Sequence, residues 1–210
     1  MPQKREQYVQ YGCGLSAPQE WRNFDASLTL RFERLPLLGK MYIKNAVRFP
    51  PNAEYADIVK GLPVVKGSCA AVYCSHVLEH LSLEDARTAL TNTYELLAAD
   101  GVFRLVVPDL EVMVSGYLQN TDVGAAQAFV RDTGMGRETR KRGVLGFIYE
   151  FLGNSSHLWC WDYKSLEHEL LEVGFKSVRR ARFNDSGEKM FIHVEDKERW
   201  DDCLGIECIK

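Results

Sequence analysis

The feature that most constrains the fold is a strand-like run followed by a helix and a second strand-like run. The segment CAAVYCS, residues 69–75, is almost wholly apolar, which is typical of a buried parallel strand. Ser82 with Asp85 three residues later forms a capping box, so a helix is predicted to begin there. Its apolar positions recur at helical spacing: Ala86, Leu90, Tyr94 and Leu97. The run VFRLVVP, residues 102–108, predicts the next strand. Such a unit aligns parallel strands and places ligand sites beyond their carboxyl ends.

The same patterns predict further elements on both sides of this unit. Strands are expected at residues 7–12, at 21–25, near residue 56, at 176–183 and at 203–210, and a helix is expected at 162–174, capped by Asp162 and ended by Gly174. Only 12 residues separate Gly12 from Asp25, so a crossover helix there is reduced to about one turn. A helical excursion is predicted between Ser27 and Lys40. The alternation of strands and helices indicates an α/β fold with a mostly parallel sheet.

Composition limits the classes of protein that the chain can belong to. The 210 residues fit a single domain, residues 1–210, and the net charge of -3 gives no broad basic field, so a nucleic-acid partner is not expected. The N-terminal MPQKREQYVQ lacks the apolar core of a signal peptide, and no membrane partner is expected. The six cysteines include no C-x-x-C pair and are interpreted as reduced thiols, which favours a cytoplasmic location. The oligomeric state is left open.

The stretch SHVLEH, residues 75–80, allows two interpretations. It contains H-x-x-E-H, the inverted zinc-protease pattern, in which two histidines hold a metal ion and a glutamate activates water. That pattern needs a sustained helix, whereas a strand precedes His76 and a new helix cap stands at Ser82. It also needs a third ligand, for which Glu150 can be nominated. The alternative is that Glu79 and His80 cap and pack a short helix, and we expect no metal site.

Six segments in order resemble a known family. They are YGCG, NFD, DIVKGLP, VYCSHVLEHL, GVFRLVVPDL and SLEHELLEVGF. This succession resembles the class I S-adenosylmethionine-dependent methyltransferases, in particular the type 11-like branch with the S-H-V-L-E-H motif. The resemblance runs from about Tyr8 to the C-terminus and is weakest at residues 27–52 and 121–154. It implies a Rossmann-like, seven-stranded sheet of order 3-2-1-4-5-7-6, with strand 7 antiparallel and helices on both faces. The implied cofactor is S-adenosylmethionine, and the product is S-adenosylhomocysteine (SAH).

The resemblance assigns cofactor-binding roles to residues at the strand ends. Glycines without a β-carbon allow a nucleoside cofactor to approach the backbone, although an ordinary strand-ending turn is the alternative. Asp25, which ends the second strand, matches the ribose-binding acid of the family, with a solvated loop aspartate as the alternative. Asp57 and Leu62 match the adenine contact, although Asp57 can equally cap a turn. The predicted cofactor-binding residues are Gly12, Cys13, Gly14, Asp25, Asp57, Leu62, Ser75 and His76.

Methyl transfer by such a fold is an in-line displacement, so alignment of the acceptor carries much of the acceleration. If the acceptor is a hydroxyl, His157 in SSHLWCWD is the first candidate for general base, and His76 is the second catalytic candidate. The alternative for His157 is packing against Trp159 or Trp161. The resemblance implies this role, because His157 lies in the loop before the last crossover helix, where the family often places acceptor-side residues.

Residues 121–154 are expected to form a helical cover over the acceptor. Phe147, Tyr149 and Phe151 are candidates for its aromatic walls, with core packing as the alternative. The basic run at residues 137–142 is either a solvated face or a site for an anionic acceptor. The expected function is methylation of a small molecule or saccharide. The alternatives are a non-catalytic cofactor-binding domain and, as the least favoured, a zinc hydrolase.

Overall fold

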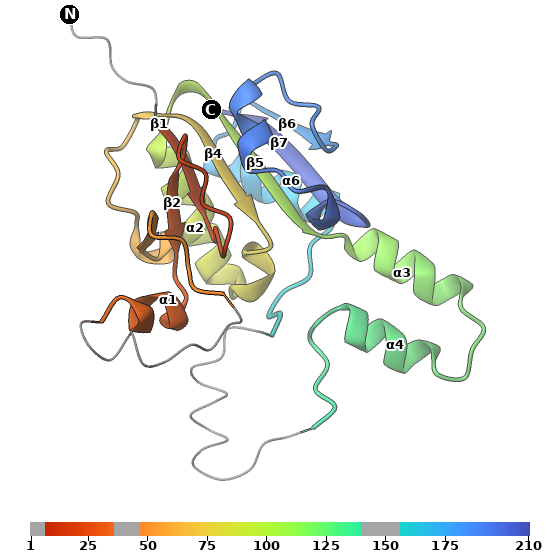
Figure 1. The fold of residues 1–210 in the computed structure, drawn as a ribbon. Coiled ribbons are helices and arrows are strands. Elements are labelled where there is room, and N and C mark those ends of the chain that lie inside the picture. The colour runs from red at the N-terminus through yellow and green to blue at the C-terminus, as the bar shows by residue number, and fades with distance from the viewer. Residues whose placement is uncertain (1–6, 36–46, 140–155) are drawn as a thin grey trace, which may run out of the picture.

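The computed structural model describes residues 7–35, 47–139 and 156–210, and these build a seven-stranded sheet of order β3-β2-β1-β4-β5-β7-β6 (Figure 1). All neighbouring strands pair in parallel except β7, which runs antiparallel to both β5 and β6. The strands are β1 Gln7–Tyr11, β2 Arg22–Asp25, β3 Ala53–Tyr55, β4 Cys69–Ser75, β5 Leu97–Pro108, β6 Ser177–Ala181 and β7 Cys203–Ile209. The predicted fold class and strand order are confirmed.

The two helices predicted from capping residues form, although Leu97, predicted on the apolar face of the first, is the first residue of β5. The α-helices are α1 Leu28–Glu33, α2 Leu83–Leu96, α3 Leu110–Gln119, α4 Ala125–Asp132 and α6 Tyr163–Val173, and the short 3₁₀ helices are η2 Ile58–Lys60, η3 Leu78–His80, η4 Lys189–His193 and η5 Lys197–Arg199. The Ser82 hydroxyl accepts the N–H of Asp85 at the start of α2. Asp162 caps α6 within a capping box, and Gly174 ends it with a left-handed φ of 114°. Both predicted helices are confirmed.

Two predicted boundaries differ from the structure in an informative way. No helix forms between Gly12 and Trp21, so the reduced first crossover is confirmed. β5 begins at Leu97, five residues before the predicted start at Val102, and the positive φ of Asp100 (60°) lies inside it. The turn at Asp100 is therefore an irregularity of the strand, because the chain turns and still continues its pairing with β4. The predicted helix between Ser27 and Lys40 is α1, and residues 36–46 lie outside the described residues.

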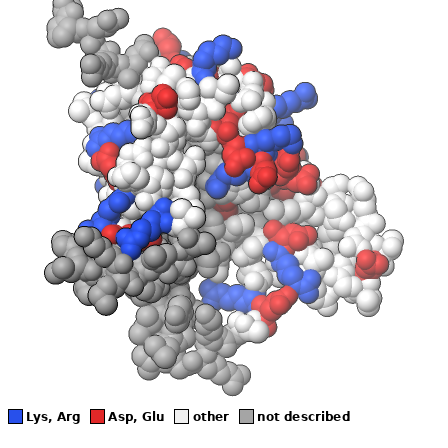
Figure 2. Space-filling model, in the orientation of Figure 1, with Lys and Arg blue, Asp and Glu red and all other residues white. Residues whose placement is uncertain are grey.

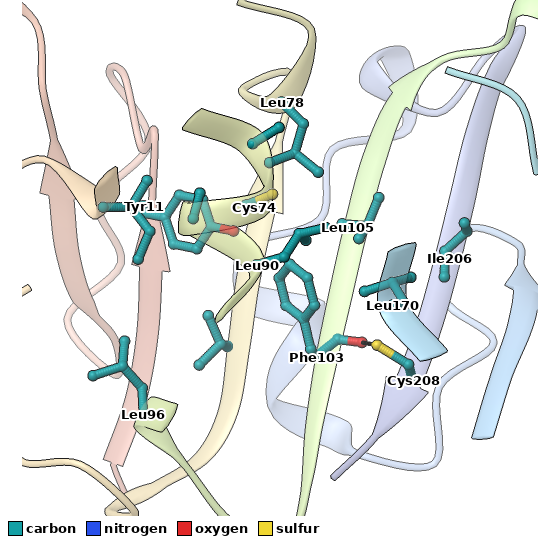
Figure 3. Close-up of a cluster of buried hydrophobic side chains, with 14 of the residues drawn as sticks. Tyr11, Cys74, Leu78, Leu90, Leu96, Phe103, Leu105, Leu170, Ile206 and Cys208 are labelled. Atoms are coloured by element: carbon teal, nitrogen blue, oxygen red, sulfur yellow. Dashed lines mark hydrogen bonds between the residues drawn. The ribbon is translucent and has the colours of Figure 1, made fainter. Parts of the chain in front are cut away.

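The core lies on both faces of the sheet, because alternate residues of the central strands point in opposite directions. On one face α2 and α6 pack on the sheet, and Figure 3 shows this cluster with Leu90 of α2 and Leu170 of α6 beside Phe103 of β5. The other face carries a second cluster that includes Tyr73, Phe191 and Trp200. This face is covered by the segment 182–202, which contains η4 and η5.

Helices α3 and α4 project from the end of β5 away from the sheet (Figure 1). The two helices contact each other through Tyr117 and Phe129, whose ring centroids lie 5.3 Å apart. α3 has no buried residue, and besides α4 it is contacted by Arg180, which donates to Glu111, and by the carbonyl of Trp161, which accepts the N–H of Leu110. α4 lies in the segment 121–154 for which a helical cover was predicted, and residues 140–154 of that segment lie outside the described residues.

Arg104, at the centre of β5, is fully buried among carboxylates on the second face of the sheet. Its guanidinium donates hydrogen bonds to Glu195, to Asp185 (3.0 Å) and to Glu207 (3.0 Å), and its carbon lies 4.6 Å from the ring centroid of Trp200. Glu207 stands opposite Arg104 on β7, so one of these contacts joins neighbouring strands. Because Asp185 and Glu195 belong to the segment 182–202, the same guanidinium fixes that segment on the sheet.

The surface carries charges of both signs (Figure 2), and the cysteines are free. Figure 2 shows Lys and Arg interspersed with Asp and Glu on the visible face, without a continuous basic area. All six cysteines are unpaired, as predicted. Within the described ranges, the helices are too short or too polar to cross a bilayer.

Replacing Arg104 with methionine should lower the free energy of unfolding by about 3 to 5 kcal/mol, because it leaves the buried carboxylate of Glu195 without its cationic partner. Denaturant unfolding followed by circular dichroism measures this loss. Arg87→Met is the matched control, since Arg87 forms a bidentate pair with Glu169 on the exposed surface, and it should cost much less. Equal losses for the two variants would contradict the role given to Arg104.

Asp185 predicts a dependence of stability on acid pH. Burial alone would raise the pKa of this carboxyl, but hydrogen bonds from Arg179 and Arg104 outweigh burial and hold its pKa at about 2. A depressed pKa in the folded state stabilises the protein above the ordinary value near 4, and this stability is lost as the pH falls from about 4 to about 2. The difference in unfolding midpoint between the parent and Asp185→Asn should therefore be larger at pH 5 than at pH 3. A difference independent of pH would contradict the assignment.

Candidate active site

The turn after β1 requires glycine for two separate reasons. Gly12 and Gly14 have φ angles of +69° and +54°, in the left-handed region that side chains disfavour. A β-carbon on Gly12 would also lie 2.2 Å from Cγ2 of Val77, which follows β4. At Gly14 a β-carbon would meet nothing within 4 Å, so the backbone there faces open space. The turn is thus pressed against the end of β4 on one side and is open on the other.

Asp25, the last residue of β2, holds this turn in place. The N–H of Gly14 donates to Oδ2 of Asp25 at 2.9 Å, and the N–H of Ser27 donates to Oδ1 at 2.7 Å. A carboxylate oxygen can accept two hydrogen bonds, and each oxygen of Asp25 accepts one here, so both keep acceptor capacity for a ligand. The structure therefore brings the two predicted glycines and the predicted acid together.

Cys13 lies within the turn as a buried thiol. Burial and the nearby charge of Asp25 raise the pKa of Cys13 to about 12, so the thiol is protonated at neutral pH. Its side chain packs in a small cluster with Leu30, Phe49 and Ala53. Cys13 thus fills space beside the turn, and its contact with a cofactor stays a prediction.

Asp57 and Leu62 lie beyond the end of β3, and their observed contacts are structural. Asp57 caps η2, because its Oδ1 accepts the N–H of Val59 at 3.0 Å, while Lys60 contacts the other oxygen at 3.2 Å. Leu62 is buried in the main core cluster. The contact of these two residues with adenine stays a prediction.

Ser75, the last residue of β4, is bound by an arginine that the sequence analysis did not identify. The hydroxyl of Ser75 accepts a hydrogen bond from Nε of Arg199 at 2.9 Å, and its carbonyl accepts from Nη2 at 2.8 Å. Arg199 lies in η5, which the Arg104 network holds on the sheet. No motif marks Arg199, and only the folded chain brings the two residues together.

His76 is held at both ring nitrogens. Nε2 lies 3.0 Å from the carbonyl oxygen of Arg199, and Nδ1 lies 3.2 Å from Oε1 of the buried Glu79. Burial lowers the pKa of His76, but Cys203, Glu79 and the Arg199 carbonyl together raise it to about 10. His76 is therefore an imidazolium at neutral pH and has no lone pair with which to accept a proton.

The H-x-x-E-H pattern does not lie on one continuous helix. β4 ends at Ser75, η3 spans only Leu78–His80, and a new cap stands at Ser82. His76 is directed to η5, whereas Glu79 and His80 lie beside His157, with one potential ligand atom of each within 4.8 Å of the others. The zinc-protease pattern needs a sustained helix, and the chain has none from His76 to His80. Glu150, the nominated third ligand, lies outside the described residues.

His157 lies at a small pocket beyond the ends of β4 and β5. The pocket is lined by Glu79, Pro108, Leu110, Met113, Thr133, His157, Trp159, Cys160 and Trp161. Nδ1 of His157 is 2.8 Å from the carbonyl oxygen of Thr133. A carbonyl can only accept, so Nδ1 carries the proton and Nε2 has the lone pair in the neutral ring. The other acceptor-side candidates, Phe147, Tyr149, Phe151, Arg140 and Arg142, lie outside the described residues.

Comparison with known proteins identifies the fold. No protein-family model matches the sequence, and no curated protein matches it. Among solved structures, PigF, solved with SAH, superposes with a TM-score of 0.53 at 13% identity, over 98% of this chain and 50% of that chain. A SAM-dependent methyltransferase from Archaeoglobus fulgidus superposes with a TM-score of 0.50 at 14% identity, over 98% of this chain and 86% of that chain. The chain has the class I methyltransferase fold.

In the class I methyltransferase fold seen here, β1 lies between β2 and β4. The chain leaves β1 toward β2 on one side and resumes with β4 on the other, so the sheet has its topological switch point at β1. Ligands of open parallel sheets bind beyond the carboxyl ends of the strands at that point. Gly12, Asp25 and Ser75 all occupy this edge, because they follow or end β1, β2 and β4.

The two glycines predict different costs of substitution. Gly14→Ala should lower the free energy of unfolding by about 1 to 2 kcal/mol, the cost of a left-handed residue with a β-carbon. Gly12→Ala should lower the free energy of unfolding by that amount and by about 1 to 3 kcal/mol more, because the new methyl group overlaps Val77. Denaturant unfolding of both variants checks the difference.

Removing the obstructing side chain isolates the second contribution. Val77→Ala introduced into Gly12→Ala should recover most of the overlap cost, after the effect of Val77→Ala alone is subtracted in a double-mutant cycle. Additive effects of the two substitutions would show that the contact between the turn and Val77 is not what excludes alanine.

Proposed function

We propose that this chain is an S-adenosylmethionine-dependent methyltransferase. The observation that carries the proposal is the glycine turn at the switch point, held by the carboxylate that ends the adjacent strand. The class I methyltransferase fold and the two superposed structures, one solved with SAH, support the same cofactor. Low sequence identity is compatible with this proposal, because the fold positions the strand ends independently of most side chains.

The residues at the switch point fit this cofactor. Gly14 presents backbone with no neighbour where a β-carbon would stand, so a ligand can approach it closely. The Asp25 oxygens, each used by one N–H, can accept hydrogen bonds from ribose hydroxyls. Asp57 and Leu62 would contact the adenine, and Ser75 the methionine part. The bound cofactor supplies an electrophilic methyl group, and the protein aligns an acceptor with it.

On the acceptor side, His157 is the proposed general base for a hydroxyl acceptor. Its Nδ1–H donates to Thr133, which fixes the tautomer whose Nε2 can accept a proton. His76, as an imidazolium, can contribute only positive charge. Met113, Trp159 and Trp161 line the small pocket beside His157, and Trp159, which is 39% exposed, would offer an aromatic face to a small-molecule or saccharide acceptor.

The alternatives differ from this proposal in what they predict. A non-catalytic domain would bind the cofactor without turnover of any acceptor. An anionic acceptor would be held by the basic run at residues 137–142, of which residues 137–139 belong to the described part of the chain. A zinc hydrolase that uses His76 is disfavoured by the contacts of that ring with Arg199 and Glu79.

Calorimetry with SAH tests the proposal, and NAD serves as the competing ligand. SAH should bind and raise the melting temperature by mass action. NAD should not bind, because no helix follows the glycine turn to place its N-terminus at a pyrophosphate. Binding of NAD without binding of SAH would overturn the assignment of the cofactor.

Asp25→Ala should weaken SAH binding by about 1 to 3 kcal/mol through the loss of hydrogen bonds to a charged group. Glu54→Gln is the control, since Glu54 is a nearby acid on β3 that pairs with Arg22 on the surface. The melting temperature without ligand shows how far Asp25→Ala disturbs the turn itself. An unchanged dissociation constant would remove Asp25 from the cofactor site.

A further inference from the structure

Glu79, His80 and His157 form a group of metal-ligating side chains from two distant segments. One potential ligand atom of each lies within 4.8 Å of the others. The carbonyl of Glu79 accepts the N–H groups of Leu158 (2.7 Å) and Trp159 (3.2 Å), so the segment that carries His157 is fixed on η3. The three side chains are therefore held together by backbone contacts that do not involve them.

The carboxylate of Glu79 points to a cation. Its residue is 1% exposed, and neither oxygen accepts a hydrogen bond from the described residues. Nδ1 of His76 is 3.2 Å from Oε1, which is an ion-pair distance without hydrogen-bond geometry, and Oε2 has no such contact. His76 faces Oε1, whereas Oε2 has no partner among the described residues, and coordination of a metal ion is one of the few ways to satisfy a buried carboxylate oxygen.

The two imidazoles are oriented as metal ligands are. Nδ1 of His80 is 3.3 Å from the carbonyl oxygen of Ser156, and Nδ1 of His157 is 2.8 Å from that of Thr133. Both Nδ1 atoms must donate, so in the neutral rings both Nε2 atoms keep their lone pairs. A backbone carbonyl that binds the second nitrogen is the usual outer partner of a metal-bound histidine. The rings meet edge to face, with centroids 4.8 Å apart.

We propose that Glu79, His80 and His157 bind a divalent transition-metal ion of the zinc type. Two imidazoles and one carboxylate are a donor set found in catalytic zinc sites that keep an open position. Ligand atoms around such an ion stand about 3.3 Å apart, so the three side chains close by up to about 1.5 Å when it binds. Two of the three side chains, Glu79 and His157, line the pocket together with Met113 and Trp161.

This site is distinct from the zinc-protease interpretation of H-x-x-E-H, since His157 replaces His76. Binding of the ion does not depend on the proposed methyl transfer. If both hold, an acceptor oxygen bound at the open position would lose its proton more readily, because a bound divalent ion lowers its pKa. His157 would then be a ligand instead of the base, and the ion would prepare the acceptor.

Titration of the chelator-treated full chain with Zn²⁺, followed by calorimetry, tests the proposal. We expect one Zn²⁺ per chain and much weaker binding of Mg²⁺, which prefers ligand sets made of oxygen. His157→Ala and Glu79→Gln should each weaken zinc binding by roughly 10- to 100-fold or more, since the loss of an outer partner alone costs that much. His168→Ala is the control, because His168 is exposed on α6, and it should bind Zn²⁺ as the parent does.

The proposal is overturned if the parent binds no zinc, or if Glu79→Gln and His157→Ala bind it as tightly as the parent. Glu79→Gln preserves the shape of the side chain, so it tests the carboxylate even if an alanine variant does not fold. Zn²⁺ should also raise the melting temperature of the parent and not that of Glu79→Gln. SAH titrations of the same samples separate the two proposals, since failure to bind SAH refutes the proposed function and leaves the zinc result standing.

Discussion

The buried guanidinium of Arg104 is the interaction on which the arrangement of the site depends. It binds Glu207 of the neighbouring strand and Asp185 and Glu195 of the segment that covers the second face of the sheet. A buried arginine needs these carboxylates, and the buried Glu195 needs the arginine, so the contact holds the segment on the sheet. In this position the segment brings Arg199 to the end of β4. The ion pairs of Arg104 thus place Arg199 where it binds Ser75 and His76 at the switch point.

Local elements of the fold could be predicted because their signals are local. The apolar run of β4, the Ser82 cap of α2 and the Gly174 end of α6 each lie within a few residues. The order of the strands came from the resemblance to a family, since apolar patterns carry no information about which strand pairs with which. The segment 182–202 was missed, because η4 and η5 are too short to show a periodic pattern.

The site divides in the same way. Gly14 and Asp25 were predicted together, and a hydrogen bond joins them. Arg199 could not be paired with Ser75 from the sequence, because 124 positions separate them and neither belongs to a motif with the other. The H-x-x-E-H pattern assumes one helix, but His76 has a positive φ of 55° and precedes η3, and a histidine 78 positions beyond Glu79 joins Glu79 and His80. The spacing of residues along the chain predicts a shared site only when the residues lie on one continuous helix or strand.

The position of β7 has a consequence for how the chain acquires its structure. β7 pairs with β5 and β6 at once, yet it follows both in the sequence. During synthesis from the N-terminus, β5 and β6 are therefore complete before the strand that joins them exists. Until β7 inserts, the edge of β5 offers unpaired backbone beside apolar side chains, and Arg104 lacks Glu207. Nascent chains at this stage expose a strand edge that is prone to intermolecular pairing.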